Sequence, residues 1–246
     1  MQYNYFGYPT DKLPPYGSVV YFAYRKLSET KKETLYLLDQ LKSQIISCTE
    51  LFSNPEVTIP KTHWWIGQIN ALVSDGSLSS PQLKKLSEIF DNEILHKHLS
   101  ADINHSFANE LSEKGFMRHA QNNFLGIETL KAMYLSDFGE VNNDTTKQLN
   151  INNEIVRNIF CMPKHFHNHI INDVRINNQL SKNDLDNLIA EWLTGYKAVK
   201  PSKELIPLSN INKIHRKMLN KYSKTIIDPF KETIEFSPLS LLFYSV

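Results

Sequence analysis

Cysteine and histidine side chains that could bind a metal ion or take part in catalysis are concentrated between residues 161 and 169. On a continuous helix Cys161, His165 and His169 would share one face, because they are spaced at i, i+4 and i+8. Thiolate and imidazole are ligands of Zn²⁺, so this spacing is compatible with a zinc site. Pro163 lies inside the span and disturbs the helical spacing. We therefore favour a polar pocket lining, with no metal, over a zinc site or an exposed loop.

Other patterns that would identify a reaction are absent from the sequence. There is no Gly-rich phosphate loop, no Cys-x-x-Cys pair and no recognisable Ser/His/Asp order. Nucleotide hydrolysis, dithiol redox chemistry and acyl transfer are therefore not supported. Cys161 near His165 could suggest a thiol nucleophile, but no further residue identifies an acyl-transfer site.

The composition is that of an ordinary globular protein, with 41% apolar and 22% charged residues among 246. This length is sufficient for one large hydrophobic core. We predict a single domain over residues 1–246, in which residues 1–17 form a packed N-terminal loop. Only eight glycines are present, and the long segments without turn residues favour helices over strands. The expected fold class is all-α.

Charge and hydropathy exclude several further classes of protein. The formal net charge is +1 and the basic residues are scattered, which argues against nucleic-acid binding. No window approaches the roughly 20 apolar residues that a membrane span needs, so we expect no transmembrane segment. Cys48 and Cys161 are far apart with no signal peptide before them, which predicts free thiols and a cytoplasmic location. We expect the apolar segment 236–246 to dock on the core, with a peripheral membrane contact or a partner-binding tail as alternatives.

Apolar residues recur at helical spacing in several segments. The expected helices cover residues 19–52 (a short and a longer helix), about 61–74, 82–112 (one or two helices), 116–137, 145–161, 184–192 and 209–226. The apolar positions of the longer first helix are Leu35, Leu38, Leu41, Ile45 and Ile46. We expect this helix to be capped at Ser28 or Thr30. Pro55 and Pro60 are expected to bracket a loop, and Pro163 to stop or kink the helix before it.

Two segments resemble signatures of squalene and phytoene synthases. Residues 61–69 read KTHWWIGQI and are similar to K/R-L-Q-W-W-R-x-x-I, and residues 31–38 are similar to R-R-x-A-I-Y-A-L. Weaker similarities follow in the order of the family at residues 124–127, 214–219, 227–230 and 236–239. The resemblance covers nearly the whole chain and implies an isoprenoid synthase-like helical bundle around a central cavity. The residues that it places along that cavity are Leu38, Trp64, Trp65 and Phe124.

The Trp pair has a second interpretation. Adjacent tryptophans on an amphipathic helix commonly serve as one core anchor and one boundary residue. Core packing is therefore the alternative to a prenyl channel at Trp64 and Trp65.

This chain departs from the family at the two Asp-rich motifs that hold Mg²⁺ on the prenyl diphosphates. The first motif falls on residues 46–50, where Ile46 and Ser47 are not acidic and only Glu50 is. The second falls on residues 160–165, where Cys161 and His165 stand in place of carboxylates. Mg²⁺ requires oxygen ligands in near-octahedral geometry, which thiol and imidazole do not provide. We therefore predict no catalytic residue and no cofactor.

The resemblance also implies a class of function. The sequence MPKH at residues 162–165 and the segment 179–184 resemble the branch of this superfamily that contains the mitochondrial complex I assembly factor. This resemblance implies a non-catalytic terpenoid-synthase-like pseudoenzyme that binds an isoprenoid or lipid, or assembles with a protein partner. The alternative is a head-to-head prenyl-diphosphate transferase. Its Mg²⁺ would be held by unexpected carboxylates: Glu50, Asp39, Glu154 or Asp173. A filled cavity would favour the assembly role and an open one would favour lipid binding.

Overall fold

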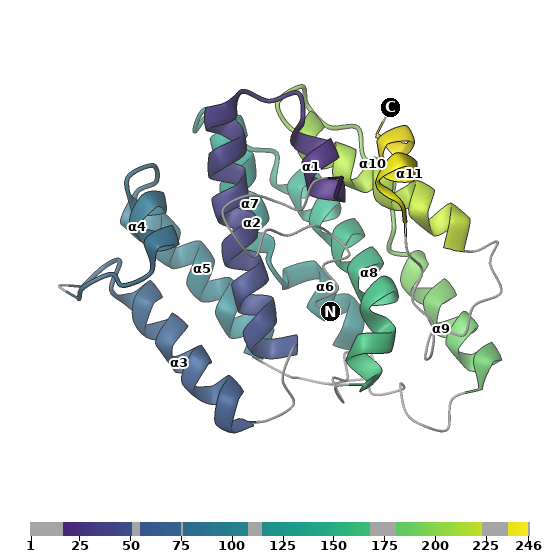
Figure 1. Cartoon of the computed structure of the whole chain (residues 1–246), viewed down its shortest axis with the longest axis horizontal. Coiled ribbons are helices and arrows are strands. Elements are labelled where there is room, and N and C mark those ends of the chain that lie inside the picture. Colours follow the sequence, from purple (N-terminus) through teal and green to yellow (C-terminus); the bar gives the residue numbers. More distant parts are fainter. Residues whose placement is uncertain are drawn as a thin grey trace.

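The computed structural model describes residues 17–50, 55–74, 76–107, 115–167, 181–222 and 236–245. These residues form α-helices and no β-strand, which confirms the predicted all-α class (Figure 1). The helices are α1 (Val19–Tyr24), α2 (Glu29–Glu50), α3 (Pro55–Asn70), α4 (Pro81–Ser87), α5 (Asn92–Phe107), α6 (Gly115–Asn122), α7 (Leu125–Leu135), α8 (Asn143–His167), α9 (Lys182–Leu193), α10 (Ile206–Tyr222) and α11 (Pro238–Tyr244). None of them is long and apolar enough to cross a bilayer. Most of the predicted N-terminal loop, residues 1–16, lies outside the described residues.

Helix starts follow local sequence signals. The Ser28 hydroxyl accepts a hydrogen bond from the Lys31 amide at 3.4 Å, so Ser28 caps α2 as predicted. Ser181 and Asp184 form a reciprocal capping box at the start of α9. A serine cap followed by proline starts α4 and also α11. Each cap satisfies a backbone N–H that has no acceptor within its own helix.

Three predicted boundaries are wrong. Residues 55–60 are not a loop, because α3 begins at Pro55 and includes Pro60. Of the stop or kink expected at Pro163, the stop is not observed, because α8 continues to His167. The segment 116–137 is not one helix: α6 ends at Asn122 and α7 starts at Leu125, with Phe124 between them in a left-handed conformation (φ 58°). A first helical turn tolerates proline, so Pro55 is compatible with the start of α3.

The core of the described residues consists of three clusters of buried side chains, of which the first and third share α8 and the first and second share α2 and α7. One cluster joins α1, α2, α7, α8, α10 and α11; the second joins α2, α3, α4, α5 and α7; and the third joins α6, α8 and α9. The predicted apolar positions Leu35, Leu38, Leu41 and Ile45 of α2 are all fully buried. Every residue of α8 from 151 to 160 is buried as well. Because α8 has neighbours on all sides, its polar residues must be satisfied inside the protein.

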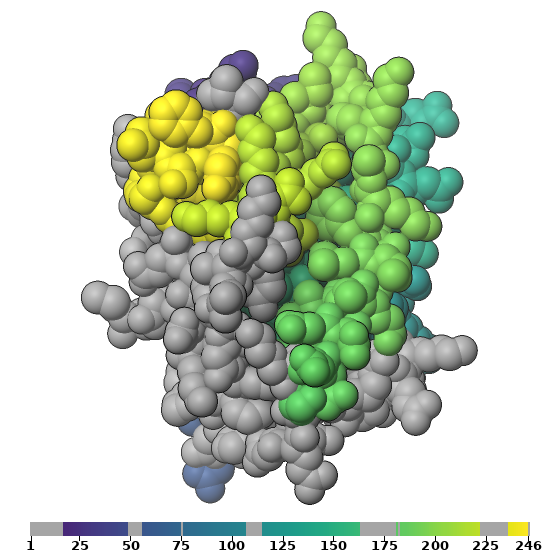
Figure 2. Space-filling view, turned by 90° about the vertical axis from the view of Figure 1, so that its right-hand side faces the viewer, coloured from purple at the N-terminus to yellow at the C-terminus, as the bar shows by residue number. Residues whose placement is uncertain are grey.

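The C-terminal segment docks on the core through α11. Leu241 is 5% exposed and packs in the first cluster, beside α1 and α10. Figure 2 shows the face where α9, α10 and α11 reach the surface. Leu239 and Phe243 point outward and are 62% and 66% exposed. The expected docking is therefore observed for one side of this short helix.

Candidate functional site

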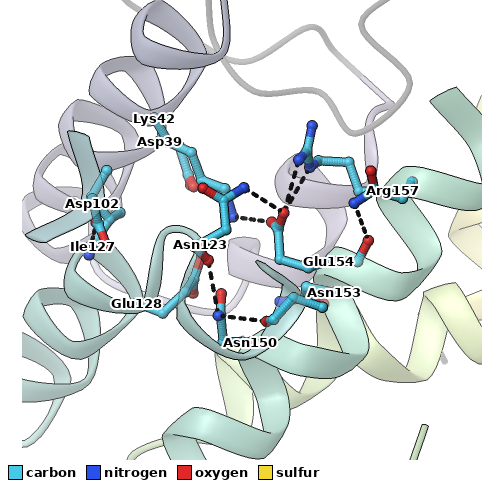
Figure 3. A network of polar contacts seen from close by, with 12 residues as sticks. Asp39, Lys42, Asp102, Asn123, Ile127, Glu128, Asn150, Asn153, Glu154 and Arg157 are labelled. Carbon is cyan, nitrogen blue, oxygen red and sulfur yellow. Dashed lines mark hydrogen bonds and ion pairs between the residues drawn. The ribbon is translucent and has the colours of Figure 1, made fainter. Parts of the chain in front are cut away.

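A cluster of buried charges lies where α2, α7 and α8 meet (Figure 3). Each of these helices carries an acid followed three residues later by a base, a spacing that places both side chains on one face. The pairs are Asp39 and Lys42 on α2, Glu128 and Lys131 on α7, and Glu154 and Arg157 on α8. All six side chains are buried. We call these six residues the charge cluster.

The ion pairs of the charge cluster form a continuous chain across the three helices. Lys131 Nζ contacts Asp39 Oδ1 and lies 3.0 Å from Glu128 Oε1. Lys42 Nζ lies 3.4 Å from the same Glu128 oxygen and 3.1 Å from Glu154 Oε1. Arg157 joins this chain with Nη2 2.8 Å from Glu154 Oε2. Three positive and three negative side chains therefore compensate one another without solvent.

The pKa values of the carboxyl groups reflect a balance between burial and these cations. Burial raises the pKa of Glu154, but Arg157 and Lys42 outweigh it and lower the pKa to about 2. The pKa of Glu128 is likewise lowered, because Lys131 and Lys42 together outweigh its burial. For Asp39 burial prevails over Lys131, so its pKa is raised.

Buried amides connect the charge cluster to neighbouring helices. Asn123 Nδ2, at the α6–α7 junction, donates to Glu154 Oε2 at 3.1 Å, and Asn150 of α8 donates to the Asn123 carbonyl at 3.0 Å. On the other side of α8, Asn153 Oδ1 lies 3.1 Å from Nδ1 of His215 in α10. Burial lowers the pKa of His215 to about 3, so its imidazole is neutral at pH 7.

Asp102 of α5 supplies the cap that α7 lacks in its own sequence. Its two carboxylate oxygens accept hydrogen bonds from the backbone N–H groups of Gly126 and Ile127, at 2.8 and 2.7 Å. The helices approach so closely here that a Cβ on Gly126 would lie 2.2 Å from the His98 carbonyl oxygen. Burial raises the pKa of Asp102 to about 7, although both hydrogen bonds and Lys42 favour the charged form.

The carboxylates of the charge cluster do not fit a magnesium site. Mg²⁺ needs several oxygen ligands that face one open position. In the charge cluster each carboxylate faces an ammonium or guanidinium group, and among the described residues no three His, Cys, Asp or Glu side chains could hold a metal ion together. Of the four carboxylates considered as unexpected Mg²⁺ ligands, Asp39 and Glu154 belong to this cluster. Glu50 ends α2 with its side chain outside the described part of the chain, and Asp173 lies outside it altogether.

The positions that correspond to the two Asp-rich motifs lie on α2 and α8. Ile46 and Ser47 are half-buried on α2, and Ile46 packs against two of the core clusters. Cys161 is half-buried on α8. The backbone of His165 continues the same helix, four residues on, but its side chain is outside the described residues. His169 is outside them too.

The predicted cavity residues Leu38, Trp65 and Phe124 belong to one packed cluster, the second of the core. Trp65 is 5% exposed and Trp64 is 45% exposed, with their rings edge to face at 4.8 Å. This is the geometry of one core anchor and one boundary residue. Phe124 faces the charge cluster, with Lys42 Nζ 4.9 Å from its ring centroid, within the range of a cation–π contact. Lining of a prenyl cavity by these residues stays a prediction.

Sequence reasoning missed most of the charge cluster. Lys42, Glu128 and Lys131 were not identified, and Arg157 was counted only among scattered cations. The detectable signal is the acid-x-x-base pattern on three separate helices. That pattern is common on exposed helix faces, so only burial distinguishes this cluster from surface ion pairs.

Comparison of this chain with protein-family models, with curated proteins and with solved structures gives no match.

Proposed function

We propose that this protein is a non-catalytic, squalene/phytoene synthase-like helical protein that acts as a binding or assembly factor. The observation that carries the proposal is the charge cluster. A head-to-head prenyltransferase needs Mg²⁺ and basic groups around a diphosphate, with carboxylates free to bind the metal. Here the carboxylates at the centre of the helices are neutralised by Lys42, Lys131 and Arg157.

The packing around α3, the helix that carries Trp64 and Trp65, favours the assembly role over lipid binding. Of the four candidates for a prenyl-cavity lining, Leu38, Trp65 and Phe124 have at most 5% of their surface exposed, whereas Trp64 is 45% exposed. The surfaces of the three buried side chains are occupied by other side chains of the same cluster. A surface role in protein assembly needs no internal cavity, whereas binding a long isoprenoid chain inside the bundle does.

The decisive experiment is incubation of the purified full chain with farnesyl or geranylgeranyl diphosphate and Mg²⁺, with an active phytoene synthase assayed in parallel. We expect no coupled product. Formation of squalene or phytoene above the enzyme-free blank would refute the proposal and restore the transferase alternative.

A thermal-shift titration with farnesyl diphosphate, with and without Mg²⁺, separates the remaining possibilities. A ligand at one hundred times its Kd stabilises the folded state by about 2.7 kcal/mol, which raises the Tm of a chain of this length by about 5–10 °C. We expect no stabilisation that depends on Mg²⁺. A shift that requires the metal would contradict the proposal, and a metal-independent shift would favour isoprenoid binding over assembly.

A further inference from the structure

A cavity of about 230 Å³ lies away from the charge cluster, between α8, α10 and the connector that follows α9. Its lining includes three basic residues, Lys197 on the connector and Lys213 and Arg216 on α10. Among the residues that the structure describes, no acidic one lines it. An otherwise nearly neutral chain therefore gathers positive charge around one concave surface, which is the electrostatic requirement of an anion site.

The connector is fixed over this cavity by buried amides. Asn152 of α8 donates to the Lys197 carbonyl at 2.7 Å and accepts from the Lys197 N–H at 3.0 Å. Gln148 donates to both the Asn152 side chain and the Gly195 carbonyl, each at 2.9 Å. The backbone that carries Lys197 is thus held in place before any ligand arrives, which reduces the entropy lost on binding.

The opposite wall is fixed in the same way. Asn212 of α10 accepts a hydrogen bond from Asn152 Nδ2 at 2.7 Å and donates to the Leu149 carbonyl at 3.1 Å. The Tyr196 hydroxyl donates to the Asn212 carbonyl at 2.8 Å. Burial raises the pKa of Tyr196 to about 12, against the attraction of Arg216, so this phenol remains a neutral donor. Both walls of the cavity are therefore polar and held by hydrogen bonds, and none of their described residues is acidic.

We propose that this cavity binds the phosphate group of a small phosphomonoester. Arg216 offers a planar fork that matches phosphate oxygens, and Lys197 and Lys213 supply further charge. Leu149 and Val199 line the remaining surface and provide an apolar contact for the organic part of the ligand. The cavity is smaller than a drug-sized pocket, which suits a phosphate with a short substituent. The site is independent of the proposed function, because it involves neither the charge cluster nor α3.

The test is isothermal titration of the full chain with inorganic phosphate and with phenyl phosphate. We expect saturable 1:1 binding that weakens with added salt and is tighter for phenyl phosphate. Arg216→Glu and Lys197→Glu should each raise Kd at least about tenfold, whereas Lys97→Glu, the same exchange on an exposed position of α5, should change it by less than about twofold. Ala198→Trp keeps all three cations but fills the cavity, and it should abolish binding.

Vesicles of phosphatidylcholine containing phosphatidic acid separate a lipid headgroup from a free phosphomonoester. Binding to these vesicles alone, lost in both Arg216→Glu and Ala198→Trp, would support the site and assign it to a headgroup. Binding that Ala198→Trp leaves intact, or that Lys97→Glu weakens as much as Arg216→Glu, would overturn the proposal. Absence of saturable binding to either soluble probe and to the vesicles would overturn it too. Melting temperatures of all variants confirm that these exposed substitutions leave the fold intact.

Discussion

Replacement of Lys131 by Met tests whether the charge cluster holds the helices together. Lys131 Nζ contacts Asp39 and lies 3.0 Å from Glu128, and none of its side chain is exposed. Met has a similar length without the charge, so Lys131→Met leaves two buried carboxylates with too few cations. At an effective dielectric constant of about 20, each pair at this distance is worth about 5 kcal/mol.

Protonation of Asp39 limits the free energy of unfolding that Lys131→Met can remove. The fold can neutralise Asp39 at pH 7, and doing so from its ordinary pKa of 3.8 costs about 4 kcal/mol. We therefore expect Lys131→Met to lower the free energy of unfolding by about 3–5 kcal/mol, the range seen when one partner of a buried pair is removed. The corresponding fall in Tm is about 6–20 °C.

The assay is urea unfolding at pH 7, followed by far-ultraviolet circular dichroism, in a double-mutant cycle of Lys131→Met and Asp39→Asn. Removal of both charges should cost at least about 2 kcal/mol less than the sum of the single substitutions. The matched control is the surface pair Lys31 and Asp137, 2.9 Å apart with side chains 31% and 82% exposed. Its cycle should give a coupling below about 1 kcal/mol.

Two results would refute this reasoning. One is a cost of Lys131→Met no larger than that of Lys31→Met. The other is additivity in the Asp39–Lys131 cycle within the error of the surface cycle. If the single variant does not fold while the Asp39→Asn, Lys131→Met double variant does, the coupling is demonstrated directly by the rescue.

The remaining predictions concern packing, protonation and docking. Gly126→Ala should destabilise by about 3 kcal/mol because its Cβ meets a backbone carbonyl of α5, whereas Gly67→Ala, with open space around it, should stabilise by about 0.5–1 kcal/mol in the same urea assay. The folded-state pKa of His215, about 3, is below the unfolded value of 6.5. The contribution of its neutral imidazole to the free energy of unfolding is therefore complete above pH 6.5 and is lost as the pH falls towards 3. The advantage of wild type over His215→Asn should shrink by about 3 kcal/mol between pH 7 and pH 4; an unchanged difference would contradict the buried neutral imidazole. Leu241→Ala should cost about 2–4 kcal/mol and the exposed control Leu239→Ala less than about 0.5 kcal/mol; equal losses would argue against docking of α11 through Leu241.

The sequence by itself determined the fold class and much of the helix pattern. Apolar residues spaced along α2 predicted most of its buried positions: Leu35, Leu38, Leu41 and Ile45 are fully buried, whereas Ile46 is half-buried. Ser28 predicted where that helix starts. These features are local: helical periodicity and caps depend on residues within a few positions of one another. They could therefore be identified without knowing which helices are neighbours.

Only the tertiary structure decided which polar residues are buried and with what partners. An acid and a base three residues apart look the same on an exposed helix as on α2, α7 and α8. Lys131 pairs with Asp39, which is 92 positions away in the sequence, and Lys42 pairs with Glu128, which is 86 positions away. The break at Phe124 likewise depends on Asp102 of a different helix, which caps α7. The free energy of a buried charge depends on the other charges around it, and that arrangement exists only when the helices pack together.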